Sequence, residues 1–436
     1  MDPIVIGTIG LGAFVILFVM GMPIGFSAAI VGFMGLVILK SWAVGGDSLS
    51  FLPYSITASY PLSVIPMFII MGYFAFFAGV TSDLFKTARR WVGHLPGGLA
   101  IATTFGCAGF AACSGSTIAS AAVMGKITIP EMIESGYDQK VATGVVAASG
   151  TLSALIPPST LIVIYGVITE QSIGTLLIAG LIPGILSAII YATMLFFRFR
   201  FNPKLGPVLP GASPWKERLA SLKGVWGVLV IMLIVLGGIY TGVFTPTEAG
   251  AVGAFGAFLM ALFMRRLTWP RLKEAILETG KTTAMIFMIL VGVLILLRFL
   301  ALSGLSSTIV TFATTLSVPP LVLLISILIV FMFLGMFMSA VGMMMITLPL
   351  VTPIILSLGY SPLWFGIIVI KMTEMAAITP PVGVTVYAVK SVAPDVPLEN
   401  IFRGIFPFLA MDILTVGLLI AFPSIILWLP QTMMNS

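Results

Sequence analysis

Long apolar runs, separated by short polar stretches, follow one another along the whole chain. A helix of about 20 apolar residues is long enough to cross the hydrocarbon core of a bilayer. The pattern therefore predicts an all-α polytopic membrane protein with room for roughly ten spans. The runs lie near residues 4–20, 24–40, 61–80, 97–125, 137–168, 173–197, 225–242, 247–264, 282–301, 303–317, 319–356, 361–390 and 400–429.

Four of these runs are not simple spans. Runs 97–125 and 319–356 are interrupted near their middles by small residues, and runs 137–168 and 361–390 each contain a Pro-Pro pair. Glycine allows a sharp backbone turn, and proline breaks a helix by removing a donor and crowding the preceding turn. The pattern predicts two re-entrant helical hairpins and two broken helices.

An internal repeat relates these runs. The Gly136-Tyr137 and Pro157-Pro158 pairs each recur at a constant offset in the numbering (359 − 136 = 223), and so do two single prolines; after one inserted residue, two further positions match. The repeat predicts a first half of 1–197 and a second half of 224–436. The later copies are Gly359-Tyr360 and Pro380-Pro381; the single pairs are Pro23 with Pro246, Pro130 with Pro353, Gly180 with Gly404 and Pro183 with Pro407.

Each half divides in the same way. Scaffold helices are expected over 1–80 and 224–301, and a hairpin with a broken helix over 97–168 and 319–390. The polar, proline-rich segment 198–223 reads as the linker between the halves.

The basic residues predict the orientation. The acidic start, Met1-Asp2-Pro3, is unlike a cleaved signal peptide, so the first run is taken as a span. With both termini periplasmic and five crossings in each half, 18 of the 21 Lys and Arg residues and the linker 198–223 face the cytoplasm, as the positive-inside rule requires. An odd number of crossings inverts the second half, and inverted repeats with broken helices are typical of secondary transporters.

Composition excludes other classes of protein. Hydrophobic residues make up 59% of the chain and charged residues only 8%, against about a quarter in soluble domains. An intramembrane enzyme using Ser114 or Ser116 as a nucleophile is a poor fit, because the chain has no G-x-S-x-G or H-E-x-x-H motif and its one histidine, His94, lies in a basic loop. A passive scaffold subunit leaves the paired breaks unexplained.

The two hairpin tips are candidate ion sites. Residues 113–117 (CSGST) offer hydroxyls and freed carbonyls, hard oxygen ligands that suit Na⁺, and a helix starting near Thr117 would point its positive end at an anion. The alternative is a seam of small residues for close helix packing. The matching tip, 335–342, has Ser339 as its only hydroxyl, and packing explains it equally well.

The two Pro-Pro breaks, in residues 155–160 and 373–383, indicate an ion or substrate role because both fall in mid-run and match each other. We expect Na⁺ to be bound by both tips together with the breaks, and substrate to lie between the tips. The expected Na⁺ ligands are Ser114, Gly115, Ser116, Pro157, Gly335, Ser339, Thr373, Thr379 and Pro380; the expected substrate contacts are Ser116, Ser159, Ser339 and Thr379.

A few charged residues are predicted at membrane depth, where they are costly and mark function or pairing. Lys371 and Glu374 are three residues apart and share a helix face, so they can form a structural pair or contact substrate. Asp412 can pair with a cation on a neighbouring helix. Arg298 lies near the outer end of its span, where it either extends to the interface or attracts an anion.

These motifs resemble the large membrane subunit of a tripartite ATP-independent periplasmic (TRAP) transporter. The resemblance covers nearly the whole chain; Ser339 departs from it, since relatives often have an acidic residue there. It is carried by residues 155–166 (LIPPSTLIVIYG), Ser172-Ile173, 179–184 (AGLIPG), 378–383 (ITPPVG) with Glu374, and 335–338 (GMFM) before Leu348-Pro349.

The resemblance implies an elevator-type secondary transporter in the bacterial inner membrane. It implies a Na⁺ gradient as the driving force, a periplasmic substrate-binding protein that delivers an organic acid, and a small four-helix membrane subunit that extends the scaffold. C4-dicarboxylates and sialic acid are among the implied substrates. A self-sufficient divalent-anion/Na⁺ symporter, which needs no binding protein, is the alternative.

Overall fold

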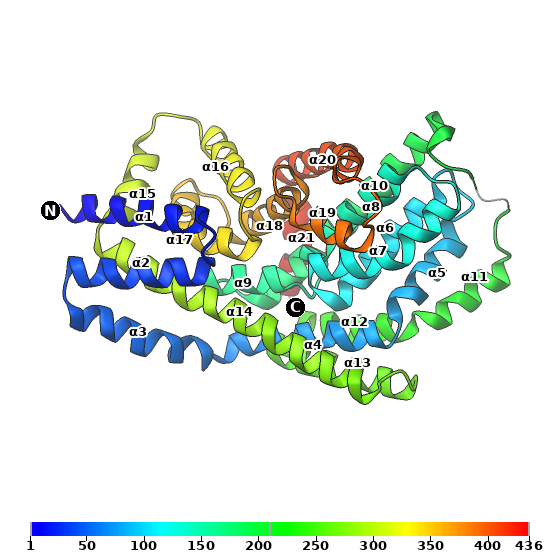
Figure 1. The fold of residues 1–436 in the computed structure, drawn as a ribbon, viewed down its shortest axis with the longest axis horizontal. Coiled ribbons are helices and arrows are strands. Elements are labelled where there is room, and N and C mark those ends of the chain that lie inside the picture. Colours follow the sequence, from blue (N-terminus) through cyan, green and yellow to red (C-terminus); the bar gives the residue numbers. More distant parts are fainter. Residues whose placement is uncertain (1, 209–210, 435–436) are drawn as a thin grey trace.

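The apolar runs form helices in the computed structural model, which describes residues 2–208 and 211–434. The molecule is elongated, with the N-terminal end at one extreme and the C-terminal helix near the middle (Figure 1). Met1 and Ser436, the termini predicted to be periplasmic, lie outside the described residues, as do Leu209 and Pro210 of the predicted linker.

The described residues of the first half form ten α-helices. The scaffold part is followed by a hairpin, a broken helix and one long helix. They are α1 (Pro3–Val19), α2 (Ile24–Leu39), α3 (Trp42–Thr57), α4 (Val64–Phe77), α5 (Val80–Val92), α6 (Gly98–Ser114), α7 (Thr117–Glu134), α8 (Gln139–Gly150), α9 (Thr160–Ile168) and α10 (Ile173–Phe201), with 3-10 turns at Tyr60–Ser63 and Thr151–Ala154.

The second half follows the same order after a connecting region. That region holds 3-10 turns at Pro203–Leu205 and Leu222–Gly224 and the short helix α11 (Trp215–Ser221). The remaining helices are α12 (Trp226–Tyr240), α13 (Pro246–Phe263), α14 (Trp269–Leu302), α15 (Leu305–Thr315), α16 (Pro320–Gly335), α17 (Ala340–Ser357), α18 (Pro362–Ile378), α19 (Val384–Val392), α20 (Leu398–Ala421) and α21 (Ser424–Met434).

Helix bounds recur at the sequence offset. Helices α7 and α17 both have 18 residues, and their first residues, Thr117 and Ala340, are separated by the same offset as the repeated motifs. Packing between the halves is reciprocal: α2 contacts α14 while its counterpart α13 contacts α4, and α8 contacts α20 while its counterpart α18 contacts α10. The inversion of one half relative to the membrane stays a prediction.

Six helices in the described residues are long and apolar enough to span a membrane, or seven if the bent pair Trp215–Gly224 and Trp226–Tyr240 is one span. Four further apolar helices are shorter, and two of them, like Ala340–Ser357 among the six, belong to the predicted re-entrant hairpins, so the predicted ten crossings exceed what length and composition alone support. The shorter helices are Pro3–Val19, Ile24–Leu39, Gly98–Ser114 and Pro320–Gly335.

The apolar runs predicted neither α3 nor α5, nor the short α11 within the predicted linker, and they misplaced some helix ends. Helix α3 contains Asp47 and several serines, and α5 carries a basic face, so neither reads as an apolar run. Helix α14 begins at Trp269, well before the apolar run 282–301, because charged helix formers extend it. Helix α10 continues to Phe201, into the predicted linker 198–223.

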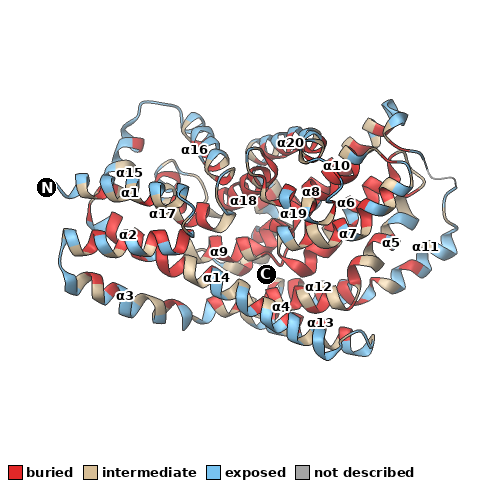
Figure 2. Cartoon of the chain, viewed as in Figure 1, coloured by how far each residue is buried: buried red, intermediate tan, exposed pale blue. Residues whose placement is uncertain are grey.

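Burial shows which helices are central. Every residue from 364 to 376 of α18 is buried, and so is every residue from 141 to 150 of its counterpart α8 (Figure 2). Large apolar side chains lie exposed on the peripheral helices, for example Ile16, Val19 and Phe263. Such surfaces are stable when lipid is the solvent, and they leave the broken helices at the centre of the molecule.

Candidate functional site

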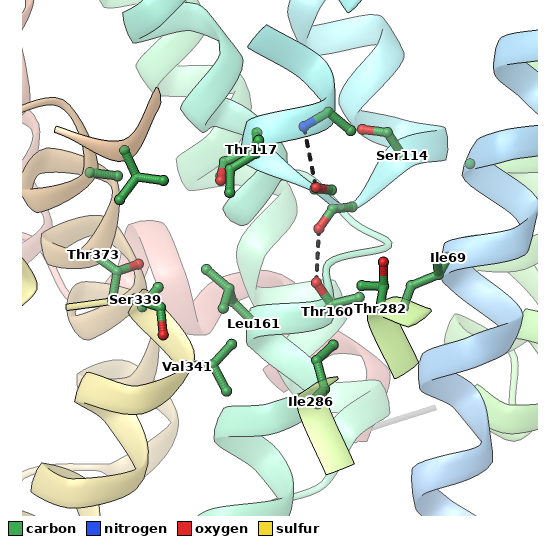
Figure 3. Close-up of a pocket in the computed structure, with 18 of the residues that line it drawn as sticks. Ile69, Ser114, Thr117, Thr160, Leu161, Thr282, Ile286, Ser339, Val341 and Thr373 are labelled. Carbon is green, nitrogen blue, oxygen red and sulfur yellow. Dashed lines mark hydrogen bonds between the residues drawn. The ribbon is translucent and has the colours of Figure 1, made fainter. Parts of the chain in front are cut away.

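A cavity of about 290 Å³ lies where the two hairpin tips meet. Its wall combines the first tip, between α6 and α7, with the second tip, between α16 and α17. Helices α9 and α18 contribute from the broken helices, and α4 and α14 close the wall from the scaffold. Figure 3 shows Ser114, Thr117 and Thr160 on one side of this space, with Ser339 and Thr373 opposite.

The first tip is a tight turn fixed by glycine and serine. Gly115 ends α6 in the left-handed region (φ 56°), and Ser116 caps α7 by accepting a hydrogen bond from the Ala119 N–H at 3.4 Å. The predicted start of a helix at Thr117 is confirmed. The Oγ atoms of Ser114 and Ser120 lie 2.7 Å apart. The tip thus gathers several hydroxyl oxygens beside a helix N-terminus.

The first tip is docked on the first broken helix. A Cβ atom at Gly115 would lie 2.8 Å from the Pro158 carbonyl oxygen, so only glycine fits there. The Thr160 hydroxyl donates to the Gly115 carbonyl at 2.9 Å (Figure 3). The break itself is confirmed: helix stops at Gly150, a 3-10 turn follows, and helix resumes at Thr160.

Two predicted residues of this break lie behind the tip rather than on the cavity wall. Ser159 is fully buried; its Oγ donates to the Ala154 carbonyl at 2.5 Å and accepts from the Ile162 N–H at 3.3 Å. Pro157, joined to Pro158 by a cis peptide, is also buried. A direct substrate contact by Ser159 therefore requires a change from this arrangement.

The second tip is more open and less polar. Ser339 is exposed and caps α17, accepting from the Gly342 N–H at 3.3 Å. Gly335, at the end of α16, is buried against Ala376 of α18. Around Ser339 the wall is otherwise formed by apolar side chains, among them Met338, Val341 and Met343.

The second broken helix interrupts at the predicted place, after Ile378. The Thr373 hydroxyl donates to the Ile370 carbonyl at 2.6 Å and lines the cavity. The Thr379 hydroxyl donates to the Met375 carbonyl at 2.6 Å and, like Pro380, lies off the cavity wall. Both hydroxyl oxygens keep lone pairs for a cation.

The cavity thus brings together six of the predicted residues: Ser114, Gly115, Ser116, Gly335, Ser339 and Thr373. In the described structure its lining does not include Pro157, Ser159, Thr379 or Pro380. Their assignments as Na⁺ or substrate ligands stay predictions. Within the described ranges no group of three or more His, Cys, Asp or Glu residues could hold a metal ion, so a cation here would depend on hydroxyl and carbonyl oxygens.

The residues that line the cavity from the scaffold helices were not predicted from the sequence. Tyr73 of α4 and Thr282 of α14 both line it and supply hydroxyl groups. Tyr73 stands within an apolar run and matches the apolar Leu296 at the repeat offset, and Thr282 stands between Lys281 and Thr283 where an apolar run begins. No local pattern in the sequence identifies them, because the packing of distant helices places them here.

A fully buried charge cluster lies behind the second broken helix. Lys371 Nζ is 2.7 Å from Glu374 Oε2 and 2.7 Å from Asp412 Oδ1, so both predicted pairings are confirmed. The Tyr191 hydroxyl donates to Asp412 Oδ1 at 2.6 Å. The cluster joins α18, α20 and α10, and therefore both halves, next to the cavity-lining Thr373. The contacts favour a structural pair over direct substrate contact.

Paired hairpins, broken helices and a cavity between them, in a chain of apolar helices, define a polytopic membrane transport protein. The chain belongs to the TRAP transporters, as a large membrane subunit: residues 11–425 match the family model described as "Tripartite ATP-independent periplasmic transporter, DctM component". The resemblance seen in the sequence is confirmed, and the protein is an integral inner-membrane protein.

Relatives agree with this assignment. The chain is 37% identical over 386 residues to the C4-dicarboxylate TRAP transporter large permease protein DctM of Pseudomonas aeruginosa, covering 88% of this chain and 89% of that one. It is 33% identical over 412 residues to the sialic acid TRAP transporter large permease protein SiaM of Vibrio cholerae, covering 94% and 95%. These relatives are permeases, not enzymes, which removes the enzyme alternative.

A solved structure shares the fold. The YdaH transporter of Alcanivorax borkumensis superposes with a TM-score of 0.63 at 14% identity, covering 88% of this chain and 90% of that one. At this identity the likeness concerns the fold alone.

Proposed function

We propose that the chain is the translocating subunit for Na⁺-coupled secondary uptake of an organic acid by an elevator mechanism. One observation carries the proposal: both hairpin tips and both scaffold helices α4 and α14 surround one central cavity of about 290 Å³. The relatives named for C4-dicarboxylate and sialic acid point to a carboxylate substrate.

The coupling ion is proposed to bind at the tips. The first site uses Ser114, Gly115 and Ser116 with the Pro157 break, and the second uses Gly335 and Ser339 with the Thr373–Thr379–Pro380 segment. Unwound backbone and hydroxyl oxygens coordinate Na⁺ in other repeat transporters. Bound Na⁺ would order the tips and offset the negative charge of the carboxylate.

The moving part is proposed to be the two hairpins with the two broken helices. The reciprocal packing of α2 with α14 and of α13 with α4 supports an inverted pair of scaffold units around this part. At Gly72 of α4 a Cβ atom would lie 2.9 Å from the Ser114 Cα atom, so the scaffold meets the first tip through a small residue. A smooth contact of this kind suits one rigid body moving past another.

The proposal includes two partners and an orientation. A periplasmic binding protein delivers the acid to the outer face, and a small four-helix subunit extends the scaffold. The termini face the periplasm and the linker 198–223 faces the cytoplasm. The basic residues of α5 and of the linker, placed on one side by the positive-inside rule, support this orientation.

Reconstitution tests the function. Proteoliposomes holding this chain and its small subunit are given the loaded binding protein outside, with labelled C4-dicarboxylate or sialic acid. We expect uptake only with an inward Na⁺ gradient. Uptake that ran equally well without the gradient would refute the coupling. Na⁺-driven uptake by this chain alone, without either partner, would favour the self-sufficient symporter.

A further inference from the structure

A second cavity lies far from the hairpin tips, at the C-terminal end of α5. Its volume is about 440 Å³, and its lining consists of Lys86, Arg89, Arg90 and His94 with Gly93, Gly211 and Ser213. Among the residues that the structure describes, no acidic side chain lines it. The positive-inside rule accounts for the side of the membrane on which these basic residues are placed, but not for their convergence on one cavity.

Beside the pocket, the connecting helix α11 packs against α5, and the pocket residues Gly211 and Ser213 lie just before α11 in the chain. The Thr87 hydroxyl donates to the Ser221 carbonyl at 3.0 Å, and the rings of Trp91 and Trp215 meet edge to face at 6.2 Å. Arg218 lies over the Trp215 ring, with Cζ 5.2 Å from the ring centre. These contacts hold α11, and with it the preceding segment with Gly211 and Ser213, next to the end of α5.

The positive charges at the opening are mostly uncompensated. Arg89 forms an ion pair with Glu131, but over residues 2–208 and 211–434 neither Lys86 nor Arg90 has an ion-pair or hydrogen-bond partner. Arg218 Nη2 lies 3.5 Å from His94 Nδ1. As a hydrogen bond, this contact has the guanidinium as donor and Nδ1 as acceptor, because a guanidinium group only donates.

A phosphate group matches this set of donors. Its oxygens accept several charge-assisted hydrogen bonds at once, and its negative charge relieves the repulsion between neighbouring cations. The paired tryptophans Trp91 and Trp215 are of the kind that marks the membrane–water interface, and basic pockets at that level on the cytoplasmic side recognise lipid head groups. Position and chemistry thus favour a phosphate at the membrane surface.

We propose that the pocket at the end of α5 binds a phosphate-bearing anion, with the head group of an anionic phospholipid as its natural source. The anion contacts Lys86, Arg90 and His94 and holds the segment with Gly211 and Ser213, which leads into α11, against the end of α5. Because α5 lies between the scaffold helix α4 and the hairpin helix α6, the bound lipid stabilises the junction between the two parts.

The test measures thermal unfolding of the purified full chain in zwitterionic detergent. One arm titrates short-chain phosphatidylglycerol and the other inorganic phosphate. The variant K86Q/R90Q is compared with K204Q/K273Q, which removes the same charge from exposed side chains outside the pocket. All four side chains are exposed, so without either probe the midpoints should agree.

We expect phosphatidylglycerol to raise the midpoint of the wild type and the control, and the pocket variant to need about thirtyfold more lipid for the same shift. A matching response to inorganic phosphate, lost in the pocket variant, would assign the site to soluble phosphate compounds as well. The proposal is overturned if neither probe moves the wild-type midpoint, or if pocket and control variants respond alike.

Discussion

The two hairpin tips stand at matching positions of the internal repeat and carry different chemistry. Ser116 and Ser339 correspond, and each caps the second helix of its hairpin. The neighbouring polar residues have no counterpart: Ser114 and Ser120 of the first tip correspond to Phe337 and Met343 of the second. The shared serine keeps the backbone turn, while hydroxyl oxygens are concentrated on one side of the cavity.

In the broken helices the distribution of polar residues is reversed, because the charged residues lie in the second half. Lys371 and Glu374 of α18 correspond to Ala148 and Thr151 in the first half, and Asp412, one inserted residue later, corresponds to Ala188. Charges therefore lie behind the apolar tip, and small neutral residues behind the polar one. The same backbone arrangement therefore carries different side chains in the two halves. The first half places hydroxyl oxygens at the cavity, and the second half places a buried ion-pair cluster that joins helices in the core.

The largest effect on stability is expected from disrupting the buried cluster of Lys371, Glu374 and Asp412. Lys371→Met leaves the carboxylates of Glu374 and Asp412 buried without their cation, and removing one partner from a buried ion pair costs about 3–5 kcal/mol. We expect a steep loss of folded protein and a lower midpoint in thermal unfolding. The triple variant K371M/E374Q/D412N removes the uncompensated charges and should recover most of the loss. If K371M unfolds at the wild-type midpoint, the cluster does not stabilise the fold.

The next largest effect is expected from a substitution in the turn of the first tip, compared with one at the corresponding position of the second tip. Gly115→Ala places a Cβ atom 2.8 Å from the Pro158 carbonyl oxygen at φ 56°, and a left-handed residue with a side chain costs about 1–2 kcal/mol before any clash. We expect lower stability and slower uptake. Met338→Ala, at the corresponding position of the second tip, should change stability much less, because Met338 is only partly buried. Equal losses in both variants would remove the distinction between the tips.

Much of the architecture could be predicted because glycine and proline act locally. The constant offset of the repeat, the helix start at Thr117 and the two Pro-Pro breaks all follow from residues that cannot continue a helix. The pairing of Lys371 with Asp412 could be anticipated for a different reason, since a charge at membrane depth needs a partner.

The rest depends on contacts that no local pattern encodes. Helices α3 and α5 were missed because their polar faces interrupt the apolar runs. Tyr73 and Thr282 line the cavity only because α4 and α14 pack beside the tips. Ser159 carries a strong local signal, yet its hydroxyl is turned inward to satisfy the broken backbone.

A third experiment sharpens the difference in hydroxyl content. The pair Ser114→Ala/Ser120→Ala removes the two oxygens that lie 2.7 Å apart at the first tip. If this tip binds the coupling ion, the Na⁺ concentration for half-maximal uptake should rise at least about tenfold, since the loss of even one bond to a charged group costs about 1.5–3 kcal/mol. Thr347→Ala, which removes a buried hydroxyl of α17 off the cavity wall, is the control and should leave that concentration unchanged. An unchanged Na⁺ dependence in the double variant would place the ion elsewhere.

The smallest effect tests what the two tips share. Ser116→Ala and Ser339→Ala each delete a helix cap, which costs about 1 kcal/mol in either hairpin. Because the two capping hydrogen bonds have similar lengths, 3.4 and 3.3 Å, the two variants should lower the thermal midpoint by similar amounts. Uptake should separate them: loss of Ser116, which sits among other hydroxyls, is partly compensated by its neighbours, whereas Ser339 is the only hydroxyl of its tip. We therefore expect Ser339→Ala to raise the half-saturating Na⁺ concentration more than Ser116→Ala. The reverse order would mean that the second tip contributes its helix cap and not an ion ligand.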